Sequence, residues 1–330
     1  MKLAILGAGA WGTAFGIAMA PQHRVTLWCR DDALRARMGD ERRNDRYLPD
    51  VALPQNLALA SDAVAALADC ELVVCAVPTA GLRETLKLVR RHAPARGVVW
   101  LCKGFEAGSA KFPHQVAAEE LAPGASYAAL SGPSFADEVA RGLPAAVTLA
   151  SPDAAFAAAA ARELHTRRLR VYSTSDLAGV ETGGAVKNVI AIAAGVCDGL
   201  KLGNSARAAL ITRGLAEMTR LGVALGGRAE TFMGLAGAGD LMMTATSDLS
   251  RNRRVGLGLG TGKPLASLLA ELGHVAEGVP TAAEVVRLAA AKGVEMPIAS
   301  AVERLLEGRI SAQVAVDELM NRAPRNESVY

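Results

Sequence analysis

Three glycines near the start of the chain constrain its fold more than any other feature. The apolar run at residues 2–6 is followed by GAGAWG at residues 7–12, which fits the pattern G-x-G-x-x-G. The apolar stretch at residues 13–20 predicts a helix, and residues 25–29 predict a second strand. A strand, a glycine turn, a helix and a strand within about 30 residues are typical of a dinucleotide-binding unit.

Each glycine has its own physical role in such a unit. Gly7 permits the tight turn after the strand, Gly9 lets a pyrophosphate approach the backbone, and Gly12 lets the helix pack closely on the strand. The free N–H groups at the start of the helix then face the phosphates. We therefore expect a dinucleotide to bind at this turn.

The same segment has two alternative interpretations, because it is uncharged from residue 3 to residue 20. Its length suits a membrane-spanning helix, and the small residues at positions 18 and 20 resemble a signal-peptide cleavage site. However, four glycines interrupt the stretch, and each weakens a helix by about 1 kcal/mol relative to alanine. A signal peptide also usually has a more basic start. We therefore favour the dinucleotide-binding interpretation.

Arg30 stands where an acidic residue contacts the ribose hydroxyls in NAD-binding units, at the end of the second strand. A guanidinium at this position suits a 2′-phosphate, so we expect NADP(H) as the cofactor, with NAD(H) as an alternative. An ordinary solvated arginine beside Asp31 and Asp32 is the competing interpretation.

The alternation of strands and helices continues to about residue 173. We expect further strands at residues 71–77, 98–102, 126–130, 145–150 and 169–172, and helices at 81–91 and 114–121. Beyond them the chain has a helical period, with helices expected at residues 176–198, 205–223, 228–237, 265–272, 279–292 and 298–307. The sequence thus predicts a doubly wound, Rossmann-type α/β domain over residues 1–174 and an all-helical, substrate-binding domain over residues 175–330.

Charge and cysteine content limit the class of protein. The formal net charge is +3, which is too small to indicate a nucleic-acid or membrane partner by itself. The chain has five cysteines, and no two of them form a CxxC pair. This pattern favours buried free thiols in a reducing compartment over a disulfide framework or a zinc site. We expect a cytoplasmic protein without a metal.

Lys187 is the main candidate for catalysis. It is the only charged residue between Glu181 and Asp198, within an apolar helical stretch. Burial would disfavour its ammonium form and move its pKa toward neutrality, which suits proton transfer. A lysine that reaches solvent at a helix surface is the alternative. Because Gly183 and Gly184 leave room for close approach one turn earlier, we favour the catalytic role.

Two other polar positions lie in apolar surroundings. Lys103 follows a predicted strand and precedes a glycine, where it could polarise a carbonyl group or hold an anion. Asp240 lies in the glycine-rich stretch GLAGAGDLMMT, with Thr244 one helical turn further. Its carboxylate could orient a lysine or a substrate hydroxyl, or it could cap a helix.

Ser250, Arg251 and Asn252 provide a hydroxyl, a guanidinium and an amide in consecutive positions. Such a set suits a phosphate group, although Arg253 and Arg254 make a solvated basic run the alternative. The glycines of VGLGLGTGKP at residues 255–264 imitate a nucleotide loop, but no strand precedes them. We interpret this stretch as a helix end and a turn.

Taken together, these segments make the chain resemble bacterial NAD(P)-dependent glycerol-3-phosphate dehydrogenases over nearly its whole length. The resemblance rests on GAGAWGTAF, the KG pair at residues 103–104, LSGPSFADEVARGLPAAV, GGAVKNVIAIAAGVCDGL, LAGAGDL, SRNRRVG and AEGVPTA. It implies hydride transfer from the nicotinamide to C2 of dihydroxyacetone phosphate, which gives sn-glycerol 3-phosphate for phospholipid synthesis.

The resemblance also implies roles for individual residues. It assigns the cofactor to Gly7, Gly9, Trp11, Gly12, Arg30, Lys103, Ala136, Arg251, Val275 and Glu277. It assigns the substrate to Lys103, Gly132, Ser134, Lys187, Asp240, Ser250, Arg251 and Asn252, with Lys187 as proton donor and acceptor and with Lys103 and Asp240 as further catalytic residues. Two positions depart from the family pattern: Ala10, where members often carry serine or threonine, and Asp31, where a second basic residue sometimes stands.

Two other functions remain open at this point. A 3-hydroxy acid dehydrogenase of similar two-domain build would also use a helix lysine with an asparagine nearby. A non-catalytic NADP(H)-sensing module would bind the cofactor without needing Lys187. We expect a triose phosphate as the partner molecule, with no nucleic acid and no integral membrane segment. The oligomeric state stays open, and a homodimer is one candidate.

Overall fold

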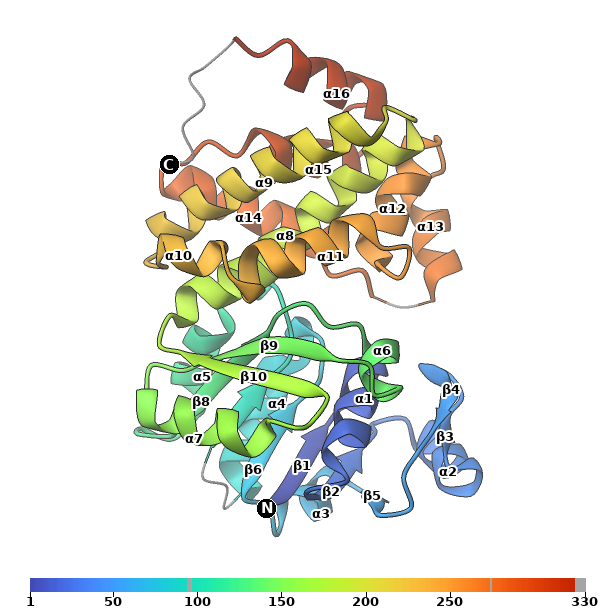
Figure 1. Ribbon diagram of the computed structural model, residues 1–330, viewed down its shortest axis with the longest axis vertical. Coiled ribbons are helices and arrows are strands. Elements are labelled where there is room, and N and C mark those ends of the chain that lie inside the picture. The colour runs from blue at the N-terminus through green and yellow to red at the C-terminus, as the bar shows by residue number, and fades with distance from the viewer. Residues whose placement is uncertain (94–96, 274, 324–330) are drawn as a thin grey trace. The chain divides into compact units, whose positions relative to one another are not determined.

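Residues 1–93, 97–273 and 275–323 are described by the computed structural model (Figure 1). Contacts within the chain divide it into two units. The first unit contains Met1–Cys102 and Lys111–Leu177, and the second contains Lys103–Ala110 and the chain from Ala178 onward. The division of the sequence at residue 174 remains a prediction about its domains.

A mixed sheet forms the centre of the first unit (Figure 1). Within the described residues, its strands run in the order β10-β9-β8-β7-β6-β1-β2-β5. Their bounds are β1 (Lys2–Leu6), β2 (Arg24–Trp28), β5 (Leu57–Leu59), β6 (Leu72–Cys75), β7 (Val98–Trp100), β8 (Tyr127–Ser131), β9 (Ala145–Ala150) and β10 (Leu169–Thr174). Neighbouring strands are parallel except β8 and β9, which are antiparallel. A separate small sheet pairs β3 (Arg43–Asn44) with β4 (Leu48–Ala52).

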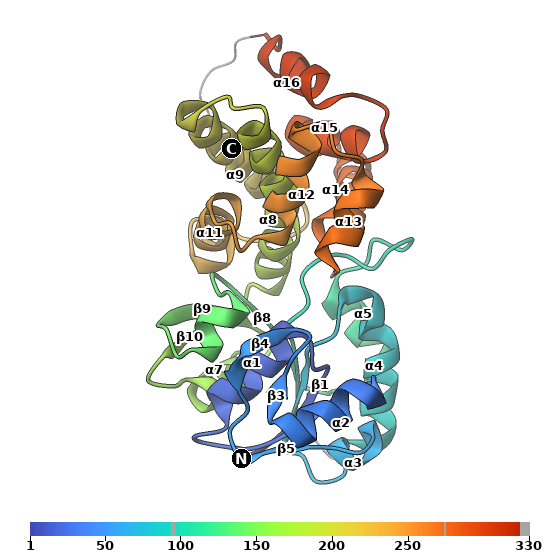
Figure 2. The ribbon, with the colours of Figure 1, turned by 90° about the vertical axis from the view of Figure 1, so that its right-hand side faces the viewer.

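Helices cover both faces of the larger sheet. They are α1 (Ala10–Met19), α2 (Asp32–Glu41), α3 (Ala63–Leu67), α4 (Thr79–His92), α5 (Pro113–Glu120), α6 (Ala136–Ala140) and α7 (Ala154–Leu164). The strand order reverses between β1 and β6, so right-handed crossovers place α1 and α4 on opposite faces. Figure 2 shows α4 and α5 on the side of the sheet away from α1. Ligands of open α/β sheets bind at such a reversal, beyond the carboxyl ends of the strands.

The N-terminal segment belongs to the core of this unit. Leu3, Ile5, Phe15 and Met19 are at most 1% exposed, and they pack with residues of the neighbouring strands. The first apolar run is therefore a central strand followed by a helix, as the dinucleotide-binding interpretation predicts. The predicted strands are all present, but β3, β4 and β5 were not predicted.

The second unit consists mainly of helices. They are α8 (Leu177–Gly199), α9 (Asn204–Ala224), α10 (Ala229–Phe232), α11 (Asp240–Thr246), α12 (Arg251–Gly260), α13 (Leu265–Leu272), α14 (Gly278–Ala291), α15 (Pro297–Leu306) and α16 (Ala312–Met320). A π-helical turn, η1 (Leu235–Gly239), lies between α10 and α11. A continuous helix over residues 228–237 was predicted, and this prediction was wrong because η1 interrupts the α-helical backbone after α10.

Helix α8 is the centre of the second unit. Among the described helices, it alone is long and apolar enough to cross a membrane by length and composition. Its most apolar part is completely buried by the surrounding helices, and core helices commonly pass the same test. This helix therefore gives only weak evidence for a membrane span.

Glycines let α12 cross α8 at backbone contact. A Cβ atom on Gly195 would lie 2.0 Å from the carbonyl oxygen of Arg253, and one on Gly256 would lie 1.9 Å from that of Ile192. The glycine run at residues 256–262 is thus mainly a packing surface inside α12. The interpretation of a helix end and turn holds only for the last part, where Gly262 has a φ of +84°.

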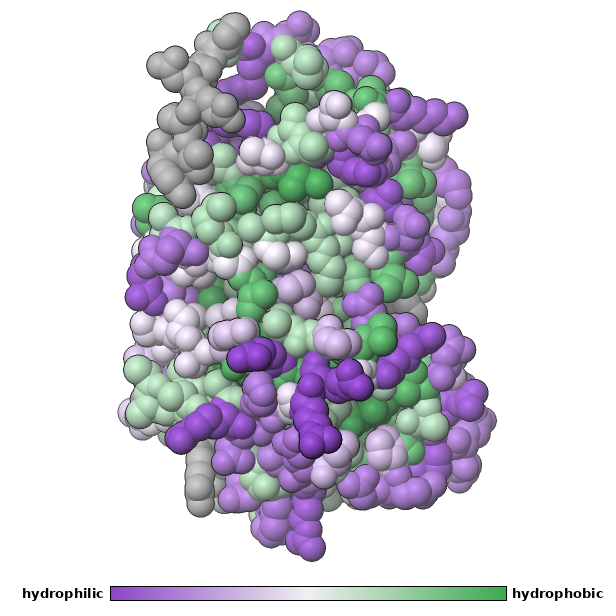
Figure 3. Space-filling model, viewed as in Figure 1, coloured by the Kyte–Doolittle hydropathy of each residue, from purple (hydrophilic) through white to green (hydrophobic). Residues whose placement is uncertain are grey.

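The surface of the second unit carries some exposed apolar side chains. Val223, Met233 and Met242 are 47%, 60% and 55% exposed. In the view of Figure 3, apolar and weakly polar residues cover much of the surface over α9. Apolar side chains contribute much of any protein surface, so this distribution alone indicates no particular partner.

Candidate active site

A buried cluster around Asp240 brings two of the predicted lysines together in the second unit. One carboxylate oxygen of Asp240 accepts from Lys187 at 2.5 Å, and the other accepts from Lys103 at 2.6 Å. The Thr244 hydroxyl accepts a second hydrogen bond from Lys187 at 2.9 Å and donates to the Asp240 carbonyl oxygen. The third hydrogen of the Lys187 ammonium has no acceptor among the described residues, so it is available to a substrate oxygen.

The environment of Lys187 makes its proton mobile near neutral pH. Burial lowers the pKa of Lys187 to about 7; Asp240 opposes this shift, and the charge of Lys103 adds to it. Burial would raise the pKa of Asp240, but the two ammonium groups hold it below its usual value. Asp240 is therefore a carboxylate that anchors two cations. Lys187 is buried, as the sequence predicts, and it does not reach solvent at a helix surface.

Local chain geometry explains why Asp240 meets Lys187. The turn η1 ends immediately before Asp240, and it packs against α8 at Gly183, where a Cβ atom would lie 2.3 Å from the carbonyl oxygen of Ala236. Gly237 is equally restricted, because a Cβ atom there would lie 2.1 Å from the Phe232 carbonyl oxygen. Gly183, one helical turn before Lys187, thus accommodates the backbone of η1. This contact places α11 beside α8.

A chain of buried amides connects α8 to the start of α14. The Asn252 side chain donates to Asn188 Oδ1 at 2.9 Å and accepts from the Gly278 N–H at 2.9 Å. Asn188 in turn donates to the Gly184 carbonyl oxygen. Asn252 thus has a structural role in addition to the phosphate contact that the sequence predicts. Asn188 follows Lys187 in the sequence, but this position alone gave no reason to select it.

The predicted phosphate-binding set lies at the N-terminus of α12. Ser250 is the N-cap residue, and its hydroxyl accepts from the Arg253 N–H. Arg251 is exposed at the start of the helix; partial desolvation lowers the pKa of its guanidinium, and the charge of Glu277 opposes that shift. Arg253, by contrast, is buried and pairs with Asp198 and Asp248. The run is therefore not simply solvated, because Arg253 is buried and paired while Arg251 and Arg254 are exposed.

The glycine turn of the first unit fits a pyrophosphate. A Cβ atom on Gly7 would lie 2.5 Å from the Ala76 carbonyl oxygen, and one on Gly12 would lie 1.9 Å from that of Gly7. Gly9 has no heavy atom within 4 Å of the corresponding position, so its outer side is open. Gly9 is also the N-cap of α1 and no side chain caps the helix, which leaves the first N–H groups to bind an anion. Trp11 is half-buried beside this turn and stacks edge-on against Phe15.

Basic side chains lie just beyond β2. Arg30 is exposed, whereas Asp31 caps α2 by accepting from the Leu34 N–H. Asp31 also pairs with Arg46 at 3.3 Å, and Arg46 lies over the ring of Tyr47. Asp31 is therefore occupied by protein partners. Arg46 is a second cation in this region, and it was not predicted because it lies 15 positions from Asp31 in the sequence.

The other predicted residues are distributed over both units. Gly132 follows β8 with a φ of +141°, and the Ser134 hydroxyl donates to its carbonyl oxygen at 3.1 Å. Ala136 begins α6 and is half-buried. In the second unit, Val275 is 50% exposed, and Glu277 accepts from the backbone N–H of Lys103 at 3.3 Å.

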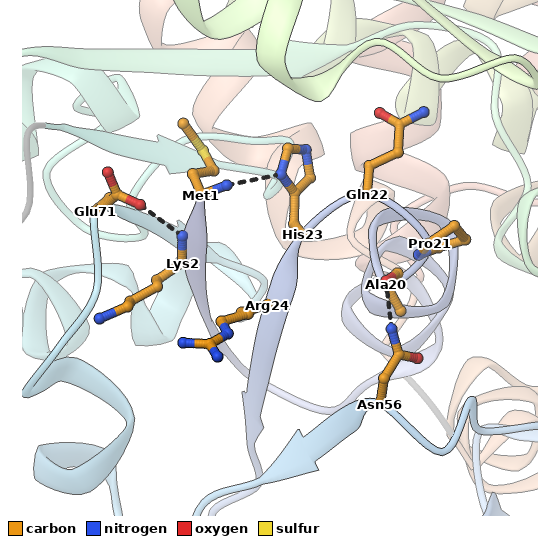
Figure 4. Close-up of a pocket in the computed structure, with 9 residues that line it drawn as sticks. All are labelled: Met1, Lys2, Ala20, Pro21, Gln22, His23, Arg24, Asn56 and Glu71. Carbon is orange, nitrogen blue, oxygen red and sulfur yellow. Dashed lines mark hydrogen bonds between the residues drawn. The ribbon is translucent and has the colours of Figure 1, made fainter.

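A shallow cavity of about 420 Å³ lies at the edge of the sheet opposite to the glycine turn (Figure 4). It is lined by Met1, Lys2, Ala20, Pro21, Gln22, His23, Arg24, Asn56 and Glu71. Lys2 and Arg24 begin their strands, so this is the amino-terminal edge, whereas Gly7 follows the carboxyl end of β1. The cavity is therefore distinct from the dinucleotide turn. The Met1 amino group and the His23 ring meet within it (Figure 4).

Comparison with known proteins connects these features to one family. Residues 2–157 match the family model described as NAD-dependent glycerol-3-phosphate dehydrogenase N-terminus, and residues 176–317 match the C-terminus of the same family. The chain belongs to the NAD-dependent glycerol-3-phosphate dehydrogenase family. A glycerol-3-phosphate dehydrogenase [NAD(P)+] of Dechloromonas aromatica is 58% identical over 327 residues, which are 99% of each chain. One from Thiobacillus denitrificans is also 58% identical, over 99% of this chain and 100% of that one.

A solved structure supports the fold assignment. The glycerol-3-phosphate dehydrogenase of Coxiella burnetii is 42% identical and has a TM-score of 0.93, covering 97% of this chain and 99% of that one. The Rossmann-type first part and the helical second part are therefore those of the family. These matches do not favour a 3-hydroxy acid dehydrogenase or a cofactor-sensing module. The chain is an NAD(P)-dependent oxidoreductase with a small-molecule substrate.

Proposed function

We propose that this chain reduces dihydroxyacetone phosphate to sn-glycerol 3-phosphate with Lys187 as the general acid. The observation that carries the proposal is the buried Lys187–Asp240 pair, in which burial lowers the pKa of Lys187 to about 7 and Asp240 keeps its ammonium form accessible. When bound, the reduced nicotinamide supplies the hydride for the substrate carbonyl carbon. Lys187 uses its remaining hydrogen to bind the carbonyl oxygen and donates a proton as the alkoxide forms. In the reverse direction, neutral Lys187 accepts the proton of the C2 hydroxyl.

Asp240 and Lys103 complete the proposed catalytic group. Asp240 holds Lys187 in position and keeps enough negative charge nearby for the ammonium form to exist in a buried site. Lys103 adds a positive charge that stabilises the developing alkoxide. Thr244 fixes the direction of the Lys187 ammonium through its hydroxyl.

The phosphate of the substrate is proposed to bind at the start of α12. Arg251 supplies the guanidinium, the first N–H groups of the helix add donors, and Ser250 and Asn252 define the local backbone. Gly132 and Ser134 are proposed to contact the substrate from the first unit. Binding energy at the phosphate then positions the carbonyl for reaction.

The cofactor is proposed to bind along the carboxyl edge of the sheet. Gly7, Gly9 and Gly12 accommodate the pyrophosphate, and Arg30 accepts the 2′-phosphate, which favours NADP(H) over NAD(H). Trp11 and Ala136 contribute further contacts from the first unit. Lys103, Arg251, Val275 and Glu277 contribute further contacts from the second.

The setting of the reaction is also a proposal. We infer that the enzyme acts in the cytoplasm, that its product enters glycerophospholipid synthesis, and that it forms a homodimer. Buried Cys29, Cys70, Cys75 and Cys197 support a reducing compartment, because none of these thiols forms a disulfide.

The first experiment mixes purified protein with dihydroxyacetone phosphate and follows the loss of NADPH or NADH absorbance. We expect turnover with both cofactors and a higher kcat/KM with NADPH. Arg251→Ala should raise KM for dihydroxyacetone phosphate, with a smaller loss of cofactor affinity because Arg251 is also proposed to contact the cofactor. An unchanged KM would reject the phosphate assignment. Cofactor binding without turnover would reject the proposed reaction.

A further inference from the structure

Helix α14 holds the loop that carries Lys103. The loop comprises Lys103–Ala110, which belongs to the second unit. Glu284 Oε1 accepts from the Gly108 N–H at 2.8 Å, and Arg287 Nη1 donates to the Gly108 carbonyl oxygen at 3.0 Å. At the other end of the loop, Glu277 accepts from the Lys103 N–H. Both ends of the loop are thus hydrogen-bonded to α14 or to the residue before it.

The spacing of these residues explains how one helix makes all three contacts. Glu277 and Glu284 are seven residues apart, which is two helical turns, so they lie on the same face. Arg287 is one turn further and pairs with Glu284 through its Nε atom at 3.0 Å. Glu284 is only 8% exposed. A buried carboxylate needs such partners, and here the Gly108 backbone is one of them.

The loop is held by its contacts with α14 and by the burial of Phe105 and Ala110. It has no regular secondary structure, and Gly104 and Gly108 have φ values of +140° and +79°. A glycine-containing loop samples many conformations when its ends are released. The position of the Lys103 ammonium on Asp240 therefore depends in part on the contacts that Gly108 makes with α14.

We propose that Glu284, supported by Arg287, is a positioning residue for the reaction. It fixes Gly108, and through the loop it holds the Lys103 ammonium against Asp240. Neither Glu284 nor Arg287 touches Lys187 or Asp240 in this role. The inference rests on the proposed catalytic function of Lys103.

The proposal predicts a specific signature in the pH profile. The charge of Lys103 lowers the pKa of Lys187, so loosening Lys103 removes part of that effect. In Glu284→Ala, the pH above which reduction declines should therefore move upward as kcat/KM falls. Loss of packing alone would lower the amount of active protein without moving the profile.

The test is a double-mutant cycle with hydrogen exchange as a second readout. Glu284→Ala should lower kcat/KM for dihydroxyacetone phosphate by about tenfold to a hundredfold, the range expected for an ångström-scale displacement of a catalytic group. In a Lys103→Ala background, the same change should cost less than about twofold, because residues that act through one another are not additive. The peptide containing Gly108 should exchange faster in Glu284→Ala. Glu284→Gln keeps an acceptor oxygen and should retain most activity.

Glu318→Ala is the matched control, because it removes another glutamate–arginine pair of the second unit, with Arg304, far from the loop in sequence. It should leave kcat/KM and the Gly108 exchange unchanged. If Glu284→Ala does not fold, Arg287→Ala replaces it in the double-mutant cycle with Lys103→Ala. Additive losses, or a loss of activity with unchanged exchange, would overturn the positioning role. Full activity in Lys103→Ala would instead reject the role of Lys103, and the inference with it.

Discussion

The carboxylate oxygen Oδ1 of Asp240 lies 2.5 Å from the Lys187 ammonium nitrogen, and both side chains are buried. Fifty-three positions separate these residues in the chain. Burial lowers the pKa of Lys187 to about 7 and Asp240 limits that shift, so both protonation states are populated near neutral pH. A group in this condition can donate a proton in one direction of a reaction and accept it in the other.

Removal of Lys187 should abolish the proton transfer while leaving the cofactor site intact. Lys187→Ala is expected to lower kcat by about 10²- to 10⁴-fold, the usual contribution of a general acid. Cofactor binding, followed by the change in nicotinamide fluorescence, should stay within error of the parent. Turnover equal to the parent would refute the assignment of Lys187.

The two directions of the reaction should depend oppositely on pH. Reduction needs protonated Lys187, so its rate should fall as pH rises through about 7, while oxidation of glycerol 3-phosphate should rise over the same range. Asp240→Asn removes the charge that favours the ammonium form, so the decline in reduction should move to lower pH. Profiles of kcat/KM for both proteins measure the shift. A move to higher pH in Asp240→Asn would contradict the proposed coupling.

Two alanine substitutions should separate cofactor binding from folding. At Gly12 an added methyl group meets the Gly7 carbonyl oxygen, so Gly12→Ala should lower the melting temperature and impair the protein generally. At Gly9 the protein leaves space, so Gly9→Ala should fold normally but bind NADPH more weakly, since its methyl group enters the space that the pyrophosphate would use. Calorimetry and NADPH titration test both. Equal NADPH affinity in Gly9→Ala and the parent would place the pyrophosphate elsewhere.

Cofactor preference should depend on the cations beyond β2. Arg30→Ala should weaken NADPH binding by about 1.5–3 kcal/mol, the value of a hydrogen bond to a charged group, and leave NADH binding nearly unchanged. Arg46→Ala provides the comparison, because Arg46 pairs with Asp31. Arg46→Ala should change the ratio of NADPH affinity to NADH affinity less than Arg30→Ala does. An equal loss of affinity for NADPH and NADH in Arg30→Ala would show that Arg30 does not discriminate between the two cofactors.

Stability should depend on pH through Glu217, which accepts from the Ile298 and Ala299 N–H groups at the start of α15. Burial raises the pKa of Glu217 to about 7 despite these donors and the nearby charges of Arg220 and Arg322. The folded protein then holds a proton that the unfolded chain releases above about pH 4.3, so this carboxyl group lowers stability as pH rises toward 7.

Glu217→Gln removes that titration. The variant should be more stable than the parent at pH 8 by a few kcal/mol and equally stable at pH 4. Denaturant unfolding at both values measures the difference. An identical pH dependence in the two proteins would mean that Glu217 is not the group responsible.

The sequence predicted the elements that depend on local pattern. The glycine turn, its strand and helix, and the burial of Lys187 all follow from spacing and apolar surroundings. Strands β3 and β4 were missed because their residues are polar or of mixed polarity, and β5 was missed because it has only three residues. The antiparallel pairing of β8 with β9 also has no local signal, since strand direction is decided by the connections and the sheet as a whole.

Long-range partners in the site could not be predicted either. Arg253 looked like part of a solvated basic run, but the crossing of α8 and α12 pairs it with Asp198. The contacts of Gly108 with Glu284 and Arg287 span more than 170 residues and involve the backbone of the loop. Such contacts depend on how helices pack, and residue type alone does not reveal them.

The crossing of α8 and α12 limits how this part of the enzyme can evolve. At Gly195 and Gly256 an added methyl group meets the backbone of the opposite helix, so no side-chain change elsewhere creates the missing space. Second-site suppressors of substitutions at these glycines should therefore be rare, and the two positions should tolerate drift poorly even when the rest of the helices is randomised. The close approach of α8 and α12 also brings Asn252 to Asn188, so this hydrogen bond depends on the same two glycines.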